Sequence, residues 1–122
     1  LDATGISMQL KNKRGKSTDK TSKTKTVQVN FTIAKNVTAQ NGHKTFYVRI
    51  TTPSGTTLGG GGSFNYQNRT LEATMKKTVE YDGQETSIST FWNVSQSLLE
   101  GTYHVSIFAD GNMIGSRSFT FK

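Results

Sequence analysis

Residues 101–122, GTYHVSIFADGNMIGSRSFTFK, decide the fold because apolar and polar residues alternate on both sides of an Asp-Gly pair. In the first half, every second residue from Tyr103 to Ala109 is apolar, which is the period expected of a half-buried strand. Asp110-Gly111 suits a two-residue type I′ turn, which needs positive φ at both central positions. The stretch therefore predicts a β-hairpin.

The turn also sets the register of this hairpin. Ile107 should face Ile114, so that both side chains point into the core. If the register continued unbroken, Phe119 would lie on the opposite face. We therefore predict a β-bulge between Gly115 and Ser118, where one extra residue restores the phase.

The rest of the chain shows the same alternation, with turn residues about every ten positions. Asp82-Gly83 predicts a second hairpin of the same type, and residues 94–100 predict a single helical turn. No stretch has a sustained helical period. Strands are predicted at residues 4–10, 26–34, 45–52, 64–66, 69–81 and 84–93, followed by the two strands of the final hairpin. This pattern predicts an all-β fold, an antiparallel sandwich or barrel.

One local motif favours the sandwich. The sequence LLEGTYHV, residues 98–105, resembles the tyrosine corner of immunoglobulin-like domains. The resemblance implies that the Tyr103 hydroxyl bonds to backbone upstream. Val105 stands where the second core cysteine of that family would be, and the single tryptophan, Trp92, lies on the fifth predicted strand rather than the third. The vertebrate subclass is therefore excluded.

What remains resembles an immunoglobulin-like module of bacterial multidomain or cell-surface proteins, a β-sandwich of about seven strands. This resemblance implies a non-catalytic accessory module that positions or docks a neighbouring domain or a protein partner, in an extracytoplasmic or cell-surface location. The ending is also similar to the C-terminal sorting domains of Bacteroidetes secreted proteins, which finish on a Lys-tipped strand. That alternative implies export and surface attachment.

Length and composition agree with one domain spanning residues 1–122, large enough to form its own core. The chain has no cysteine, so it can form neither a disulfide nor a thiolate metal site. No apolar run is long enough to span a bilayer.

The net charge of +7 comes almost entirely from residues 11–25, the basic segment, which carries +6 of it. The basic segment contains no apolar residue, so we expect a mobile loop. It is either a solvated linker or a contact for a polyanion such as nucleic acid, lipopolysaccharide or a phosphate-bearing glycan. It lacks aromatic residues for base stacking. Its positive charges are Lys11, Lys13, Arg14, Lys16, Lys20, Lys23 and Lys25.

Residues suited to catalysis are scarce. The chain has two histidines, and Asp82 and Asp110 are assigned to turns. Glu80 and Glu85 would be neighbours across the Asp82-Gly83 hairpin, where a carboxylate pair is more often solvated than catalytic. We expect no enzyme activity, no metal site and no cofactor.

Several aromatic residues and their polar neighbours are predicted to face outward. They could form a protein interface or a carbohydrate platform, or they could be scattered over separate faces or covered by a loop or a neighbouring domain. Phe108 and Met113 should be cross-strand partners and the best exposed apolar pair. Residues 53–63, which include four consecutive glycines, are predicted to be a flexible loop. The candidate interface residues are Tyr47, Arg49, Phe91, Phe108 and Met113, with Tyr66 and His104 also on outward faces.

Overall fold

The structure is a computed structural model that describes residues 1–38 and 40–122. Strands dominate these residues, and a single 3-10 turn, η1 (Thr21–Lys23), lies among them. The strands are β1 (Ala3–Lys11), β2 (Ser17–Thr18), β3 (Thr26–Ile33), β4 (Gly42–Thr51), β5 (Ser63–Tyr66), β6 (Arg69–Glu72), β7 (Met75–Tyr81), β8 (Thr86–Asn93), β9 (Gly101–Ala109) and β10 (Asn112–Phe121).

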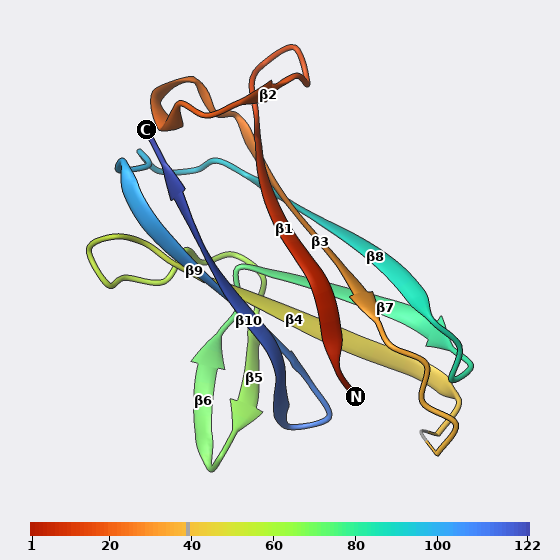
Figure 1. Cartoon of the computed structure of the whole chain (residues 1–122). Coiled ribbons are helices and arrows are strands. Elements are labelled where there is room, and N and C mark those ends of the chain that lie inside the picture. The colour runs from red at the N-terminus through yellow and green to blue at the C-terminus, as the bar shows by residue number, and fades with distance from the viewer. Residues whose placement is uncertain (39) are drawn as a thin grey trace.

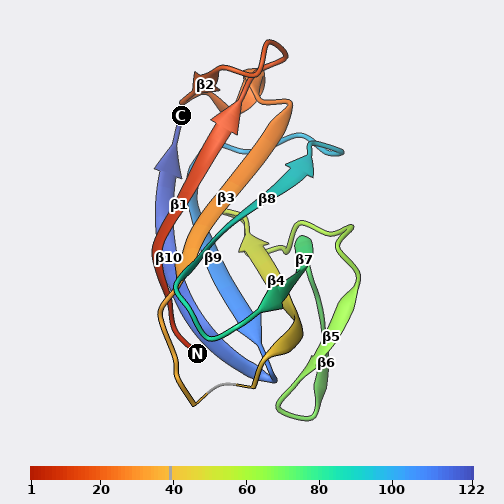
Figure 2. The same cartoon turned by 90° about the vertical axis from the view of Figure 1, so that its right-hand side faces the viewer.

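Two antiparallel sheets form a sandwich, as Figures 1 and 2 show. One sheet has the order β2-β1-β3-β8 and the other β10-β9-β4-β7, while β5 and β6 pair only with each other. The all-β fold predicted from the alternation is confirmed, and so is the sandwich that the motif at residues 98–105 favoured over a barrel. The connectivity is consistent with the immunoglobulin-like type, because β1-β3-β8 corresponds to its strands A-B-E and β10-β9-β4 to its strands G-F-C.

The core lies between the two sheets and consists of the inward side chains that the alternation selects. On β3 every second residue is buried, as predicted for a central strand, and β4, β8 and β9 follow the same rule over most of their length. The largest fully buried side chains are Tyr81, Tyr103, Phe31, Phe46, Leu10, Ile33, Ile50, Leu58, Ile107, Val27, Val29 and Val48.

The closing hairpin β9–β10 has the predicted turn, since φ is 53° at Asp110 and 77° at Gly111. The predicted bulge is also present, but it lies at Ile114, one residue before the predicted range. Gly115 pairs with Ile107, so the predicted pairing of Ile107 with Ile114 is wrong. The close approach of β1 explains why the residue after the bulge is a glycine. A Cβ on Gly115 would lie 2.9 Å from the carbonyl oxygen of Ala3.

The second Asp-Gly pair does not form a hairpin, which corrects the prediction. β7 and β8 belong to different sheets, and Asp82-Gly83 connects the sheets at one end of the sandwich. Only Gly83 has positive φ, and the Asp82 carboxylate accepts a hydrogen bond from the backbone N–H of Gln84 at 3.0 Å. Glu80 and Glu85 are therefore not cross-strand neighbours, and Glu80 instead pairs with His43 of β4.

The strand predicted for residues 69–81 is interrupted. Ala73 and Thr74 separate β6 from β7, and β6 turns back to pair with β5. Thr74 is buried, and its hydroxyl accepts a hydrogen bond from the N–H of Ile50 at 2.9 Å. Residues 94–100 are all described and contain no helical turn, so that prediction is also wrong.

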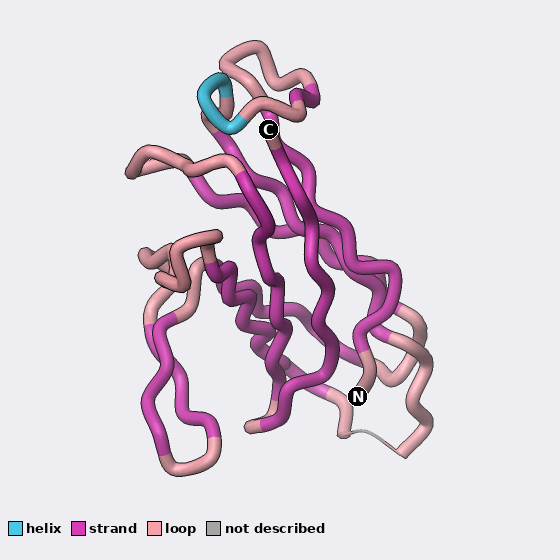
Figure 3. The backbone as a smooth tube through the Cα atoms, turned by 60° about the vertical axis from the view of Figure 1, so that its left-hand side comes forward, coloured by secondary structure: helices cyan, strands magenta, loops and turns pink. Residues whose placement is uncertain are grey.

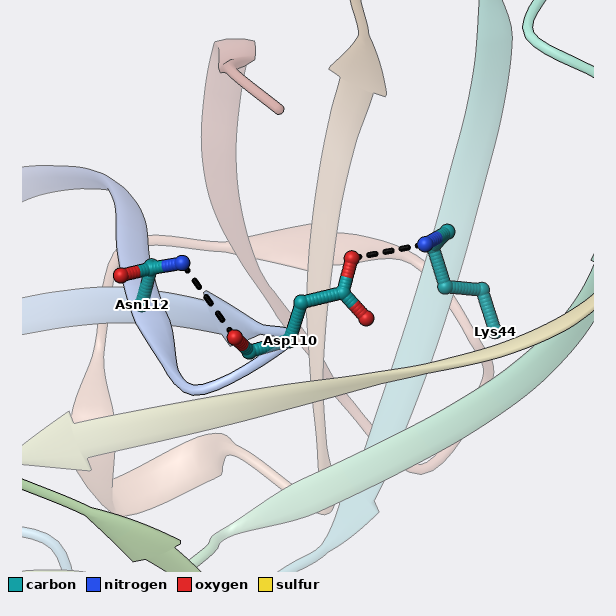
Figure 4. A network of polar contacts seen from close by, with 3 residues as sticks. All are labelled: Lys44, Asp110 and Asn112. Carbon is teal, nitrogen blue, oxygen red and sulfur yellow. Dashed lines mark hydrogen bonds and ion pairs between the residues drawn. The ribbon is translucent and has the colours of Figure 1, made fainter. Parts of the chain in front are cut away.

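A partly buried lysine, Lys44, fastens the tip of the closing hairpin to β4. The Lys44 ammonium lies 2.6 Å from the Asp110 carboxylate, and the side-chain amide of Asn112 donates to the backbone oxygen of Asp110 at 3.2 Å (Figure 4). Only 12% of the Lys44 side chain is exposed. The pair therefore holds the β9–β10 turn over the end of the sandwich.

The tyrosine corner is present. The buried Tyr103 hydroxyl donates a hydrogen bond to the backbone oxygen of Leu99 at 2.5 Å. Burial raises the pKa of Tyr103 above its ordinary value. The resemblance that implied this bond is confirmed in this respect.

Tyr103→Phe should lower the free energy of unfolding by about 1.5 kcal/mol at pH 7, because the Leu99 carbonyl loses its partner. Since the pKa is raised in the folded state, the contribution of the hydroxyl is complete below about pH 10 and is lost as the pH rises through the folded pKa. Denaturant unfolding of both proteins between pH 7 and pH 11 checks this. A difference that stays constant to pH 11 would contradict it.

Candidate functional site

The basic segment has a defined path. The Asn12 side-chain oxygen accepts hydrogen bonds from the N–H groups of Arg14 and Lys16, and φ at Gly15 is 77°, so a tight turn forms there. The N–H of Lys25 bonds to the Lys11 carbonyl at 2.8 Å and closes the base of the excursion. The segment is thus more structured than the prediction of a mobile loop implied.

The same segment is joined to the end of β10. The N–H of Thr21 bonds to the Lys122 carbonyl at 2.7 Å, and the N–H of Lys122 bonds to the Asp19 carbonyl at 2.9 Å. Thr21 and Thr24 are buried. Figure 3 shows η1 beside the C-terminal end of the chain. Backbone hydrogen bonds and two buried threonines therefore order this segment, which has no apolar side chain to bury.

Both arms of the basic segment contribute to one hollow of about 380 Å³. Asn12, Lys13 and Arg14 come from the outgoing arm, and Lys23 and Lys25 from the returning arm. The Asn12 turn and the closing bond between Lys25 and Lys11 bring these arms together. The sequence shows that the positive charges lie in one segment. The structure shows that four of these basic side chains surround one hollow.

These charges have no acidic partners in the described part of the chain. Its ion pairs join His43 to Glu80, Lys44 to Asp110 and Lys122 to Asp19, and none involves the seven basic side chains. Asp19, the one acid of the segment, faces Lys122 at 3.7 Å. The positive field at this end of the sandwich is therefore uncompensated, as in a site that attracts anions.

The structure separates the outward aromatic residues into different surroundings. Phe108 is only 3% exposed, because the β5–β6 hairpin folds over it, so its prediction as an exposed apolar residue is wrong. Phe64 stacks on Tyr47 with ring centres 4.6 Å apart and lies 4.9 Å from Phe108, while Tyr66 meets Phe108 edge-on at 5.0 Å. These four rings lie on the outer side of β4 and β9, and we call them the covered aromatic cluster because Phe64 and Tyr66 cover the buried Phe108, while the other three rings are partly exposed.

Arg49 fastens the chain that covers this cluster. Its Nε donates to the Glu72 carbonyl at 2.8 Å, and its Nη2 donates to the Thr57 hydroxyl at 3.0 Å. Of the five candidate interface residues, only Phe91 (59% exposed) and Met113 (47% exposed) present large apolar side chains to solvent, from different sheets. The five do not form one patch.

The glycine run at residues 59–62 is held against the sandwich. The N–H of Gly61 and the carbonyl of Gly62 both bond to Ala73, and the Trp92 indole donates to the Gly59 carbonyl at 2.8 Å. A Cβ on Gly61 would lie 2.6 Å from the backbone nitrogen of Met75. The prediction of a flexible loop missed these contacts, because no sequence signal shows what the glycines lie against.

Gly61→Ala should therefore lower the free energy of unfolding by about 2 kcal/mol, since the added methyl group displaces backbone. Gly55→Ala is the control for simple strain, because φ is 88° at Gly55 and nothing lies within 4 Å of an added Cβ. Thermal unfolding measures both. Gly61 itself does not have positive φ, so a loss in Gly61→Ala no larger than that in Gly55→Ala would contradict the packing explanation.

The histidines lie apart from each other. His43 is 3.1 Å from the Glu80 carboxylate on an exposed strand end, and the His104 ring is 2.6 Å from the Ser118 hydroxyl. Among residues 1–38 and 40–122, no three His, Asp or Glu side chains are grouped so that they could hold a metal ion. The same residues contain no helix with the length and apolar character needed to cross a membrane.

Comparison with known proteins identifies the family of the chain. No curated protein and no solved structure matches the chain significantly. Residues 3–122 match the family described as domain of unknown function DUF8428. Because this match spans nearly the whole sandwich, from β1 to the end of β10, the chain belongs to the DUF8428 family.

Proposed function

We propose that the domain is a non-catalytic, immunoglobulin-like accessory module that binds a polyanion through the basic segment. The carrying observation is the convergence of Lys13, Arg14, Lys23 and Lys25 on one hollow with no acidic partner in the described residues. Clustered cations bind polyanions by releasing condensed counterions. A sandwich that holds such a cluster at one end, away from the β5–β6 hairpin, can present it to a ligand without rearrangement.

The ordering of the segment supports this proposal. Immobilising a free loop on binding costs conformational entropy. Backbone hydrogen bonds to Lys11 and Lys122 already restrict the basic segment in the unbound protein, so less entropy is lost when it binds. The resemblance to bacterial cell-surface modules supports an extracytoplasmic setting, where anionic glycans and lipopolysaccharide are accessible. The sorting-domain role and docking of a protein partner stay predictions, and Phe108, buried under β5–β6, supplies no docking surface for the latter.

Retention on immobilised heparin, measured against salt, tests the proposal. With four to seven cations engaged, the logarithm of the binding constant should fall against the logarithm of salt with a slope of about −3 to −5. Duplex DNA and lipopolysaccharide serve as parallel probes that rank the polyanions. Absence of retention on all three at low ionic strength would refute polyanion binding.

A further inference from the structure

The outer face of sheet β1-β3-β8 carries a single charged side chain, Lys11 at the end of β1, which sets this face apart in a chain of net charge +7. Strand faces that meet only solvent usually carry charged residues. Here, apart from Lys11, the outward side chains are hydroxyls and amides with one aromatic ring. They are Ser7 and Gln9 on β1, Thr26, Gln28, Asn30 and Thr32 on β3, and Ser87, Ser89, Phe91 and Asn93 on β8, and we call this set the amide face.

Strand register arranges the amide face in rows. Gln9, Gln28 and Phe91 form one row across the three strands, and Ser7, Asn30 and Ser89 form the next. Side chains directly opposite on neighbouring strands lie about 5 Å apart, so the rows make a continuous surface.

Side-chain bonds hold the amides in place. The Gln28 amide donates to the Asn30 oxygen at 2.9 Å, and the Asn30 amide donates to the Ser7 hydroxyl at 3.4 Å. Each amide group has two N–H donors and an oxygen with two lone pairs, so these bonds use only part of its capacity. The remaining donors and acceptors point to a ligand that can both donate and accept.

Phe91 joins the amide face to a second feature. Its ring is 59% exposed and borders a hollow of about 570 Å³ at the open edge of β8. The other walls of this hollow include the glycine run, Lys76, Asn93 and Ser95. The backbone of the glycine run, fixed by its bonds to Ala73 and Trp92, thus lines the hollow without side chains.

We propose that the amide face and the hollow beside Phe91 bind a neutral glycan. Sugar hydroxyls donate and accept hydrogen bonds as the amides and serines do, and the apolar face of a sugar ring can stack on Phe91. An anionic ligand is drawn instead to the basic segment, which carries nearly all of the net charge. A protein interface would need more apolar area at its centre than a single aromatic ring supplies.

Affinity electrophoresis in native gels tests this proposal, with hydroxyethyl cellulose, arabinoxylan, galactomannan, laminarin and pullulan as probes. The wild-type domain should be retarded by at least one of them. Phe91→Thr removes the ring and introduces a β-branched side chain that suits a strand, and it should weaken that binding about tenfold. Leu99→Ala is the control, because Leu99 is similarly exposed (53%) but lies in the connection after β8, outside both the amide face and the lining of the hollow.

Failure to bind any of the five polysaccharides would overturn the proposal, as would equal weakening by Phe91→Thr and Leu99→Ala. Circular dichroism and thermal unfolding show whether each variant is folded, and Gln28→Ala gives a second test on the same row. Lys13, Arg14 and Lys23 changed to Gln should leave the neutral polysaccharide bound. The glycan and polyanion proposals can therefore fail independently.

Discussion

Phe108→Ser should lower the free energy of unfolding by about 4 kcal/mol, the cost of removing a buried phenyl ring. The reason is the covered aromatic cluster, in which Phe108 meets both Phe64 and Tyr66 from the β5–β6 hairpin. Serine would leave a cavity and place a hydroxyl where no partner for it lies. Thermal unfolding should show a Tm lower by about 15 °C.

Met113→Ser is the matched control, because Met113 is the cross-strand partner of Phe108 but is 47% exposed. Its substitution should change stability by less than about 1 kcal/mol. If the two residues formed an exposed interface, both changes would leave folding intact. Equal, small effects would therefore contradict the covered cluster.

Changing Lys13, Arg14 and Lys23 together to Gln should weaken heparin binding about 50-fold at 0.15 M salt, and the salt slope should become shallower by about 2. All three side chains are exposed and belong to the same hollow. Their loss lowers the local charge without removing a buried contact. Fluorescence anisotropy with labelled heparin at several salt concentrations measures both quantities.

The control carries the same loss of charge elsewhere. Lys35, Arg69 and Lys76 are also exposed, and changing them to Gln lowers the net charge by the same amount outside the basic segment. This variant should retain most of the binding. Similar losses in both variants would show that overall charge, rather than the basic segment, attracts heparin.

Sequence alternation predicted the strands well because it reports which face of a strand is buried. β3, β4 and β8 follow it closely, and their inward residues form the core. The tyrosine corner could also be predicted, since Tyr103 and Leu99 are only four residues apart. These features depend on local spacing.

Which strands pair with each other depends on the whole chain, and the sequence predicted this pairing less well than the strands themselves. Asp82-Gly83 and Asp110-Gly111 are the same dipeptide, yet only the second forms a hairpin. β7 pairs with β4 rather than β8, so the first becomes a link between sheets. A turn motif describes the backbone it suits but does not specify which sheet the following strand joins.

The candidate site shows the same limit. The positive charges of the basic segment were evident in the sequence, but their convergence depends on the Asn12 turn and on the bond from Lys25 to Lys11. The Asn-Lys-Arg-Gly sequence at residues 12–15 is a turn signal that could have suggested two facing arms. Nothing local showed that β5 and β6 cover Phe108, because that contact joins residues far apart in the chain.

Backbone amide chemical shifts, recorded while a heparin hexasaccharide is added, test polyanion binding by the basic segment most directly. We expect the largest changes at residues 12–14, Lys23 and Lys25, which line the basic hollow. Smaller changes are expected at Thr21 and Lys122, whose backbones are joined by a hydrogen bond beside it. The changes should diminish as salt is raised. Changes centred on the amide face or the β5–β6 hairpin, or no changes at low salt, would contradict the account.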